Sequence, residues 1–192
     1  MTGAAPGDVH DDVPSIRTER LEHVSMSIPF LEALSHNDVA AATREIGAVV
    51  PPWMPDQLTH FVQYRLATLR VTPSARPWLG RALVLTEGDG TRRVIGTAGF
   101  HAPPDAEGRV EIGYRVDRAY RRQGYALEAV VGLFDWAAAQ GVHRFLASIS
   151  PDNEASLALA AKLGFRQIGE QMDEIDGLEL VFETAWPPER RA

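Results

Sequence analysis

Residues 109–149 read RVEIGYRVDRAYRRQGYALEAVVGLFDWAAAQGVHRFLASI, and this stretch decides the fold. Residues 109–116 and 143–149 have the period and composition of β-strands. Between them, 124–140 carries apolar residues at helical spacing and ends before Gly141, a residue typical of the position after a helix. A strand, a helix and a strand in this order form a crossover, so we expect two parallel strands with a right-handed connection.

The flanking segments extend the predicted sheet. Upstream, strands over 81–86 and 93–100, separated by the turn residues 87–90, should form an antiparallel meander with 109–116. Downstream, we expect a helix over 153–163 and strands over 165–171 and 178–186. The chain begins with a strand-like stretch around 20–24 and predicted helices over 30–47 and 57–71. These patterns predict an α+β protein with a mixed, mostly antiparallel sheet.

The bulk properties favour one enzyme-sized domain. A chain of 192 residues fits a single core, which we place at 16–186, after a disordered start at 1–15 and before a frayed tail at 187–192. The net charge of −7 argues against nucleic acid as a partner. The absence of cysteine removes disulfides, thiolate metal sites and cysteine nucleophiles, and the six histidines lack metal-ligand spacing, so no metal is expected. Without a signal peptide or a long apolar span, the expected location is cytoplasmic, with no membrane partner.

The turn at 121–126, Arg-Arg-Gln-Gly-Tyr-Ala, stands where a crossover unit places its ligand site, beyond the carboxyl end of the first strand. The first amides of a helix lack internal partners, and the helix dipole makes that end positive. Gly124 permits close approach of a ligand, and Arg121 and Arg122 add charge. These features favour a pyrophosphate. The alternative is a plain strand-to-helix turn with two solvated arginines.

The motif Arg121-x-x-Gly124-x-Ala126 resembles the (Gln/Arg)-x-x-Gly-x-(Gly/Ala) motif of the GNAT N-acetyltransferase superfamily. The longer string from Gly113-Tyr114 through Glu128-Ala129 is similar to the RimJ/RimL branch, as are Thr18-Glu19-Arg20-Leu21, Asn153-x-x-Ser156 and Lys162-Leu163-Gly164-Phe165. The resemblance implies a three-layer fold with helices on both sheet faces, acetyl-CoA as co-substrate, and direct attack by an amine without a covalent enzyme intermediate. Many relatives are dimers, so a homodimer is compatible with it.

The resemblance also assigns roles to individual residues. The amides of 122–126 would hold the CoA pyrophosphate, and the strand ending at Val116 would bind the pantetheine arm in a gap between the parallel strands, opened by a bulge. Asn153 would contact the pantetheine from the other strand's end. The implied cofactor contacts are thus Val116, Arg121, Arg122, Gln123, Gly124, Tyr125, Ala126 and Asn153.

Two residues are candidates for the chemistry. Glu111 lies on the central strand and could accept the proton of the amine; the alternative is an edge-facing or salt-bridged carboxylate. Many relatives carry a proton-donating tyrosine where this chain has Ala160, and the Rim branch suggests Ser156 as a substitute; the alternative is a serine bonded locally to its helix. Candidates to line the acceptor side, each more often core or surface, are Trp53, Trp78, Tyr64, His101 and Glu87.

We therefore expect an N-acetyltransferase whose acceptor is a protein N-terminal amine or a small amine. The vacancy at Ala160 keeps open a non-catalytic acyl-CoA-binding or regulatory module on the same fold. A third hypothesis is an α+β domain whose arginine turn binds some other phosphate ligand.

Overall fold

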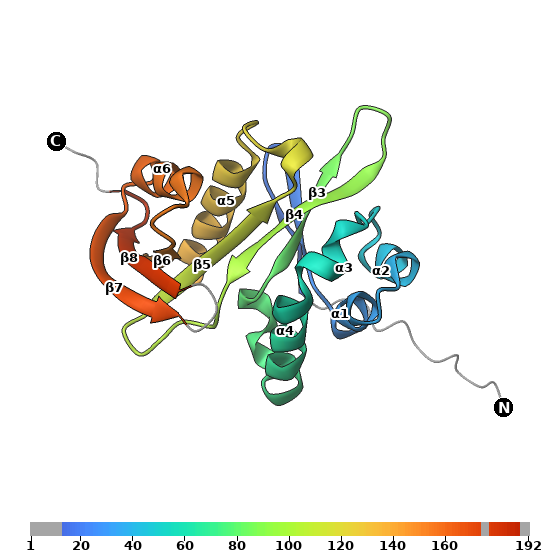
Figure 1. Cartoon of the computed structure of the whole chain (residues 1–192), viewed down its shortest axis with the longest axis horizontal. Helices are drawn as coiled ribbons and strands as arrows, with labels where there is room; N and C mark the ends of the chain where they lie inside the picture. Colours follow the sequence, from blue (N-terminus) through green and yellow to red (C-terminus); the bar gives the residue numbers. More distant parts are fainter. Residues whose placement is uncertain (1–12, 174–176, 189–192) are drawn as a thin grey trace.

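The computed structural model describes residues 13–173 and 177–188, which form a central sheet with helices on both faces (Figure 1). The predicted disordered start and frayed tail lie mostly outside these ranges. Pro14 and Ser15 are described and belong to the folded part, because the Pro14 carbonyl accepts a hydrogen bond from Arg81 and the Ser15 hydroxyl donates one to Glu22.

The sheet has eight strands in the order β1-β2-β3-β4-β5-β6-β8-β7. Neighbouring strands pair antiparallel except β5 and β6, which are parallel, as the crossover predicts. The predicted α+β class and mostly antiparallel mixed sheet are thereby confirmed. The strands are β1 (Ile16–Arg17), β2 (Leu21–Ser25), β3 (Arg81–Thr86), β4 (Arg92–Phe100), β5 (Arg109–Val116), β6 (Arg144–Ile149), β7 (Arg166–Asp173) and β8 (Gly177–Ala185).

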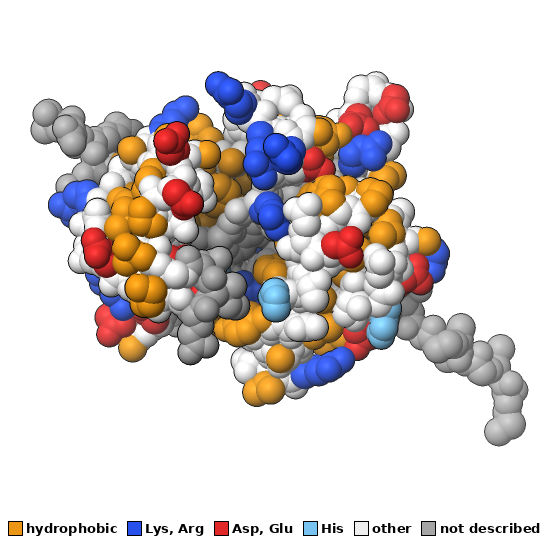
Figure 2. Space-filling model, in the orientation of Figure 1, with side chains coloured by type: hydrophobic (Ala, Val, Ile, Leu, Met, Phe, Trp, Pro, Cys, Tyr) orange, Lys and Arg blue, Asp and Glu red, His pale blue; other side chains and the backbone are white. Residues whose placement is uncertain are grey.

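Helices cover the two faces separately. On one face, α5 (Tyr125–Ala139) and α6 (Glu154–Lys162) pack on a core that includes Leu83, Ile95 and Phe145. The opposite side chains of β3 and β4, such as Val84 and Val94, pack against α1 (Ile28–Ser35), α2 (Val39–Ile46), α3 (Trp53–Gln57) and α4 (Thr59–Val71). This second group, α1 to α4, covers only the half of the sheet that contains β3 and β4. Figure 2 shows a hollow in the molecule, with α3 and α4 on one side and the arm formed by β7 and β8 on the other. Short 3-10 turns, η1 (Pro73–Trp78) and η2 (Arg118–Tyr120), complete the chain.

The single helix predicted over 30–47 is wrong, because the chain forms α1 and α2 there. Asn37 adopts a left-handed conformation with φ of 57°, which no helix can continue. Asp38 then caps α2 by accepting a hydrogen bond from the Ala41 amide at 2.8 Å. The polar residues between the two apolar stripes therefore act as a stop and a new start.

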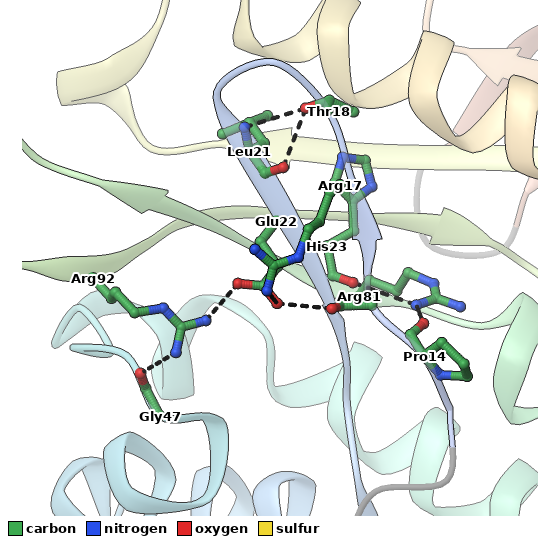
Figure 3. Close-up of polar contacts among 10 residues, drawn as sticks. Pro14, Arg17, Thr18, Leu21, Glu22, His23, Gly47, Arg81 and Arg92 are labelled. Carbon is green, nitrogen blue, oxygen red and sulfur yellow. Dashed lines mark hydrogen bonds and ion pairs between the residues drawn. The ribbon is translucent and has the colours of Figure 1, made fainter.

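A buried arginine ties the first strands to the sheet (Figure 3). The guanidinium of Arg81, 1% exposed, donates to the carbonyls of Pro14, His23 and Pro77 at 2.9, 3.3 and 3.0 Å. Beside it, the Glu22 carboxylate accepts from Arg92 at 2.8 Å, and Arg92 also reaches the Gly47 carbonyl. These contacts hold the β1–β2 hairpin, which carries residues of the site described below.

His23 makes the stability of this fold depend on pH. Its ring is 0% exposed, and burial together with the nearby Arg81 lowers the pKa of His23 from 6.5 to about 4. The unfolded chain protonates this imidazole below pH 6.5, whereas the folded chain does not protonate it until about pH 4. Lowering the pH across this interval therefore lowers the free energy of unfolding by up to about 3 kcal/mol. Urea unfolding measured at several pH values in this interval should show this decrease in the free energy of unfolding. His23→Leu should remove the part of the decrease that comes from His23. The exposed His36 gives the control His36→Gln, which should keep the decrease; an unchanged decrease in His23→Leu would contradict the assignment.

Candidate functional site

The two parallel strands, β5 and β6, are paired along only the first part of their length. β5 and β6 pair only at Arg109 with Arg144, Val110 with Phe145 and Glu111 with Leu146. Both strands continue toward Val116 and Ile149, so their carboxyl-terminal halves diverge. The bulge expected between these two strands is not seen in their pairing; a register shift occurs instead between β3 and β4, beside Leu83 and Val84.

A cavity of about 290 Å³ fills the space between the diverging strands. One wall is apolar and comes from the α5–α6 side, where Ala160 and Phe165 contribute. The remaining wall carries polar groups from five separate segments. These are His101, Tyr114, Ser148, Asn153, Ser156 and Glu179.

Two hydroxyls meet on the α6 side of the cavity. Tyr114 from β5 and Ser156 from α6 both line the cavity, and burial raises the pKa of Tyr114 against the opposing effect of Ser156, so its hydroxyl keeps its proton. Ala160 is buried in the same wall. Ser156 was predicted for this site, whereas Tyr114 was noted only as part of a motif. Strand alternation could have found it, because Tyr114 points to the same face as Ile112 and Val116.

Asn153 lies in the cavity wall as the N-cap of α6, after the end of β6, and its predicted contact with pantetheine stays a prediction. Its Oδ1 accepts a hydrogen bond from the Ser156 amide at 3.2 Å and so caps α6. A ligand in the cavity would therefore be met by the Nδ2 amide.

The opposite side of the gap holds a carboxylate and an imidazole. Glu111 lies 3.6 Å from His101, measured between Oε2 and Nδ1, and Ser148 of β6 also helps to lower its pKa. The pKa of Glu111 is lowered, chiefly by its contact with His101, against a desolvation effect that raises it. His101 lines the cavity, and Glu111 stands behind it.

The turn before α5 has the geometry of an anion site. Arg122 and Gly124 both have left-handed backbones, with φ of 62° and 86°, and α5 begins at Tyr125. Among the residues that the structure describes, no side chain caps this end, so its first amides remain open. Basic side chains gather over this turn beside the hollow in Figure 2. The predicted helix start at Gly124 is confirmed as its N-cap.

The first hairpin clamps this turn from outside. Arg20 donates from Nε to the Glu128 carboxylate at 2.6 Å and from Nη1 to the Gln123 carbonyl at 3.0 Å. Thr18 and the Arg20 amide bind the other Glu128 oxygen at 2.6 and 2.7 Å, and the guanidinium lies over the Tyr125 ring at 4.4 Å. Because the Gln123 carbonyl is held toward Arg20, the turn keeps one fixed shape.

Arg121, predicted as a cofactor contact, stays a prediction in that role and has a structural contact as well. Its Nε donates to the Val116 carbonyl at 2.9 Å, which ties the turn to the end of β5. The contact predicted for Val116 therefore stays a prediction, with its carbonyl engaged by Arg121. Residues 112–114 of β5 line the cavity instead.

Four of the five acceptor-side candidates are placed elsewhere. Trp78 packs against Phe100 and Trp136, and the Trp53 indole donates to Asp117. Tyr64 is 60% exposed on α4, and Glu87 binds Tyr120 and Arg93. His101 alone of these candidates lines the cavity.

Within residues 13–173 and 177–188, no group of three or more histidine, aspartate or glutamate side chains is placed to hold a metal ion. None of the helices in these ranges is both long and apolar enough to cross a membrane.

Comparison with known proteins identifies relatives of this chain. The sequence model of the Acetyltransferase (GNAT) domain matches residues 29–166. The uncharacterized N-acetyltransferase YjdG of Bacillus subtilis (strain 168) is 29% identical over 152 residues, which cover 78% of this chain and 88% of YjdG.

Solved structures share the fold at lower identity. RimL, a ribosomal L7/L12 alpha-N-protein acetyltransferase, superposes with a TM-score of 0.61 at 19% identity and covers 95% of this chain and 99% of RimL. The microcin C7 self-immunity acetyltransferase MccE, solved with acetyl-CoA and AMP, gives a TM-score of 0.60 at 18% identity, with 88% of this chain and 93% of MccE covered.

Proposed function

The chain belongs to the acetyltransferase (GNAT) domain family, and we propose that it transfers an acetyl group from acetyl-CoA to an amine by direct attack. One observation carries the proposal: the cavity occupies the gap between the carboxyl-terminal halves of β5 and β6, and the turn with the open amides follows the end of β5. A cofactor with a diphosphate at one end and a thioester at the other fits that arrangement.

The proposed cofactor position runs from the turn to the cavity. The amides of 122–126 and the charge of Arg122 hold the diphosphate. The pantetheine arm enters between β5 and β6. Beyond Glu111, the edge of β5 that faces β6 is not paired with a strand in the described chain. Asn153 contacts the arm from α6, and the thioester ends beside Ser156 and Tyr114.

The proposed reaction needs no enzyme-bound acyl group. The amine nitrogen attacks the thioester carbon, a C–N bond forms, and the C–S bond breaks to release CoA. The amine must lose a proton, and Glu111 is the carboxylate on that side of the gap. The leaving sulfur is met on the other side by the hydroxyls of Ser156 and Tyr114. The proposed enzyme is of the RimJ/RimL-like branch, and its acceptor is a protein N-terminal amine or a small amine. The proposed reaction takes place in the cytoplasm and needs no metal.

The competing hypothesis is a binding module that holds acyl-CoA without reacting it. Ala160 supports it, because a tyrosine found there in many relatives is absent. Release of free CoA thiol separates the two: an enzyme releases it when offered amino-terminal peptides or small amines, and Glu111→Gln slows the release. Binding of acetyl-CoA with no release for any amine would favour the module, and acetyl-CoA binding no tighter than a simple nucleotide would overturn both.

The diphosphate site predicts a strong effect at Gly124. A Cβ there meets the Arg20 guanidinium at 3.2 Å and covers the open amides, so Gly124→Leu should weaken acetyl-CoA binding at least about 100-fold, measured by calorimetry. The control is Gly141→Leu at the other end of the same helix. Its φ of 87° imposes the same backbone strain, but a Cβ there meets open space. Both variants should lose similar stability, and only Gly124→Leu should lose binding; micromolar affinity in Gly124→Leu would refute the diphosphate assignment.

The two hydroxyls predict a synergistic loss. Ser156→Ala and Tyr114→Phe should each lower the single-turnover rate about fivefold, the equivalent of about one net hydrogen bond, because the partner hydroxyl still faces the sulfur. The double variant should lose more than the product of the two single effects. Tyr64→Phe, on an exposed side chain of α4, is the control. A double variant with the wild-type rate would show that the hydroxyls have no part in thiol release.

A further inference from the structure

His101 occupies a position that the sheet prepares for it. It follows β4 directly, and its ring lies over Gly113 of β5, where a Cβ would stand 2.7 Å from Nε2. Any larger residue at position 113 would push the ring away. The imidazole side chain is 54% exposed and forms part of the cavity wall. A half-exposed ring over a glycine can meet an incoming amine.

The backbone of His101 is held from two directions. Its amide donates to the Glu111 carbonyl at 2.9 Å, which continues the pairing of β4 and β5. Arg65 of α4, 5% exposed, donates to the carbonyls of His101 and Phe100 at 2.6 and 3.0 Å. Burial lowers the pKa of Arg65 to about 10, so it keeps its charge at neutral pH. The buried guanidinium therefore fixes the end of β4 and the imidazole with it.

Glu111 is poorly suited to take the proton by itself. A carboxylate whose pKa is lowered is a weaker base than usual, and its contact with His101 is the main cause. Ser148 also helps to lower the pKa of Glu111, and the carboxylate faces Nδ1 of His101. An imidazole changes charge in the physiological pH range and is the side chain most often used as a general base. The carboxylate then orients the ring and stabilises its charged form, as in other base–carboxylate pairs.

We propose that His101 is the catalytic base of this site and that Glu111 is its positioning residue. As the amine nitrogen forms the C–N bond, Nε2 of His101 accepts one N–H proton, and the C–S bond breaks to release CoA. The imidazolium later gives its proton to solvent. The charged or titratable groups that face the ring are Glu111 from β5, Arg65 from α4 through the backbone, and Glu179 of β8 in the same cavity wall. This inference rests on the proposed function and deepens it.

The test is the rate of CoA release against pH for the full chain, with the amine that gives release. His101→Ala should lower kcat at least about 100-fold, the usual range for a lost general base, and should leave the Kd for acetyl-CoA unchanged. We expect the wild-type rate to fall at acidic pH, and this fall should be absent in His101→Ala. Added free imidazole should restore part of the activity. A side chain with a structural role alone would not respond to imidazole. His36→Gln, on the exposed end of α1, should behave as the wild type.

Glu111→Gln separates the two roles. If His101 is the base, this variant slows the reaction but keeps the fall in rate at acidic pH, because the imidazole that accepts the proton is still present. A fall at acidic pH that is lost in Glu111→Gln and kept in His101→Ala would overturn the proposal in favour of Glu111, and so would a wild-type kcat in His101→Ala. If the wild type binds acetyl-CoA but releases none with any amine, the proposed function fails, and the role of His101 falls with it. Gly113→Ala keeps both side chains in the protein but displaces the His101 ring, so it should lower kcat; a wild-type kcat in that variant would also count against His101.

Discussion

Pairing between β5 and β6 ends at Glu111 and Leu146 while both strands continue. Backbone donors and acceptors inside a protein need partners, and a strand edge without a neighbouring strand presents a row of them. The gap is thus an elongated set of hydrogen-bonding groups with an apolar wall behind it. The arm of CoA, which carries amides along a flexible chain, is complementary to such a surface. The site depends on how far apart two strands stand before it depends on any side chain.

The two ends of the proposed site are fixed by distant parts of the chain. At the proposed diphosphate end, the hairpin of β1 and β2 supplies Arg20, which holds the Gln123 carbonyl and Glu128. The hairpin is itself held by the buried Arg81 of β3, so a charge in the core supports the link between the start of the chain and a turn more than a hundred residues later. At the acceptor end, Arg65 of α4 holds the last residue of β4 and the histidine after it. Helix α4 therefore positions the acceptor side, although its group of helices, α1 to α4, packs on β3 and β4 in the other half of the sheet.

Local patterns were sufficient for most of the fold. The crossover, the meander and the start of α5 at Gly124 follow from periodicity, and the structure confirms them. The break between α1 and α2 was missed, because the apolar spacing hid the capping residue Asp38. The relation of His101 to Gly113 could not be predicted, since it requires the register that pairs Phe100 with Ile112. Arg65 gave no local signal either, because its partners are carbonyls from another element.

The alternation of a single strand separates the two proton-transfer tasks. Glu111 and Gly113 face the side where His101 lies, whereas Ile112 and Tyr114 face α6 and Ser156. A base and a hydroxyl donor placed together would bond to each other and lose their use to the reactants. Held on opposite faces of β5, they can meet only through a molecule that passes between the strands, as a thioester under attack would. Groups with different proton affinities in separate environments are the usual mark of an acid–base pair. A module that only bound acyl-CoA would have no need of the imidazole and carboxylate on the acceptor side, and that asymmetry favours the enzyme even though position 160 carries an alanine.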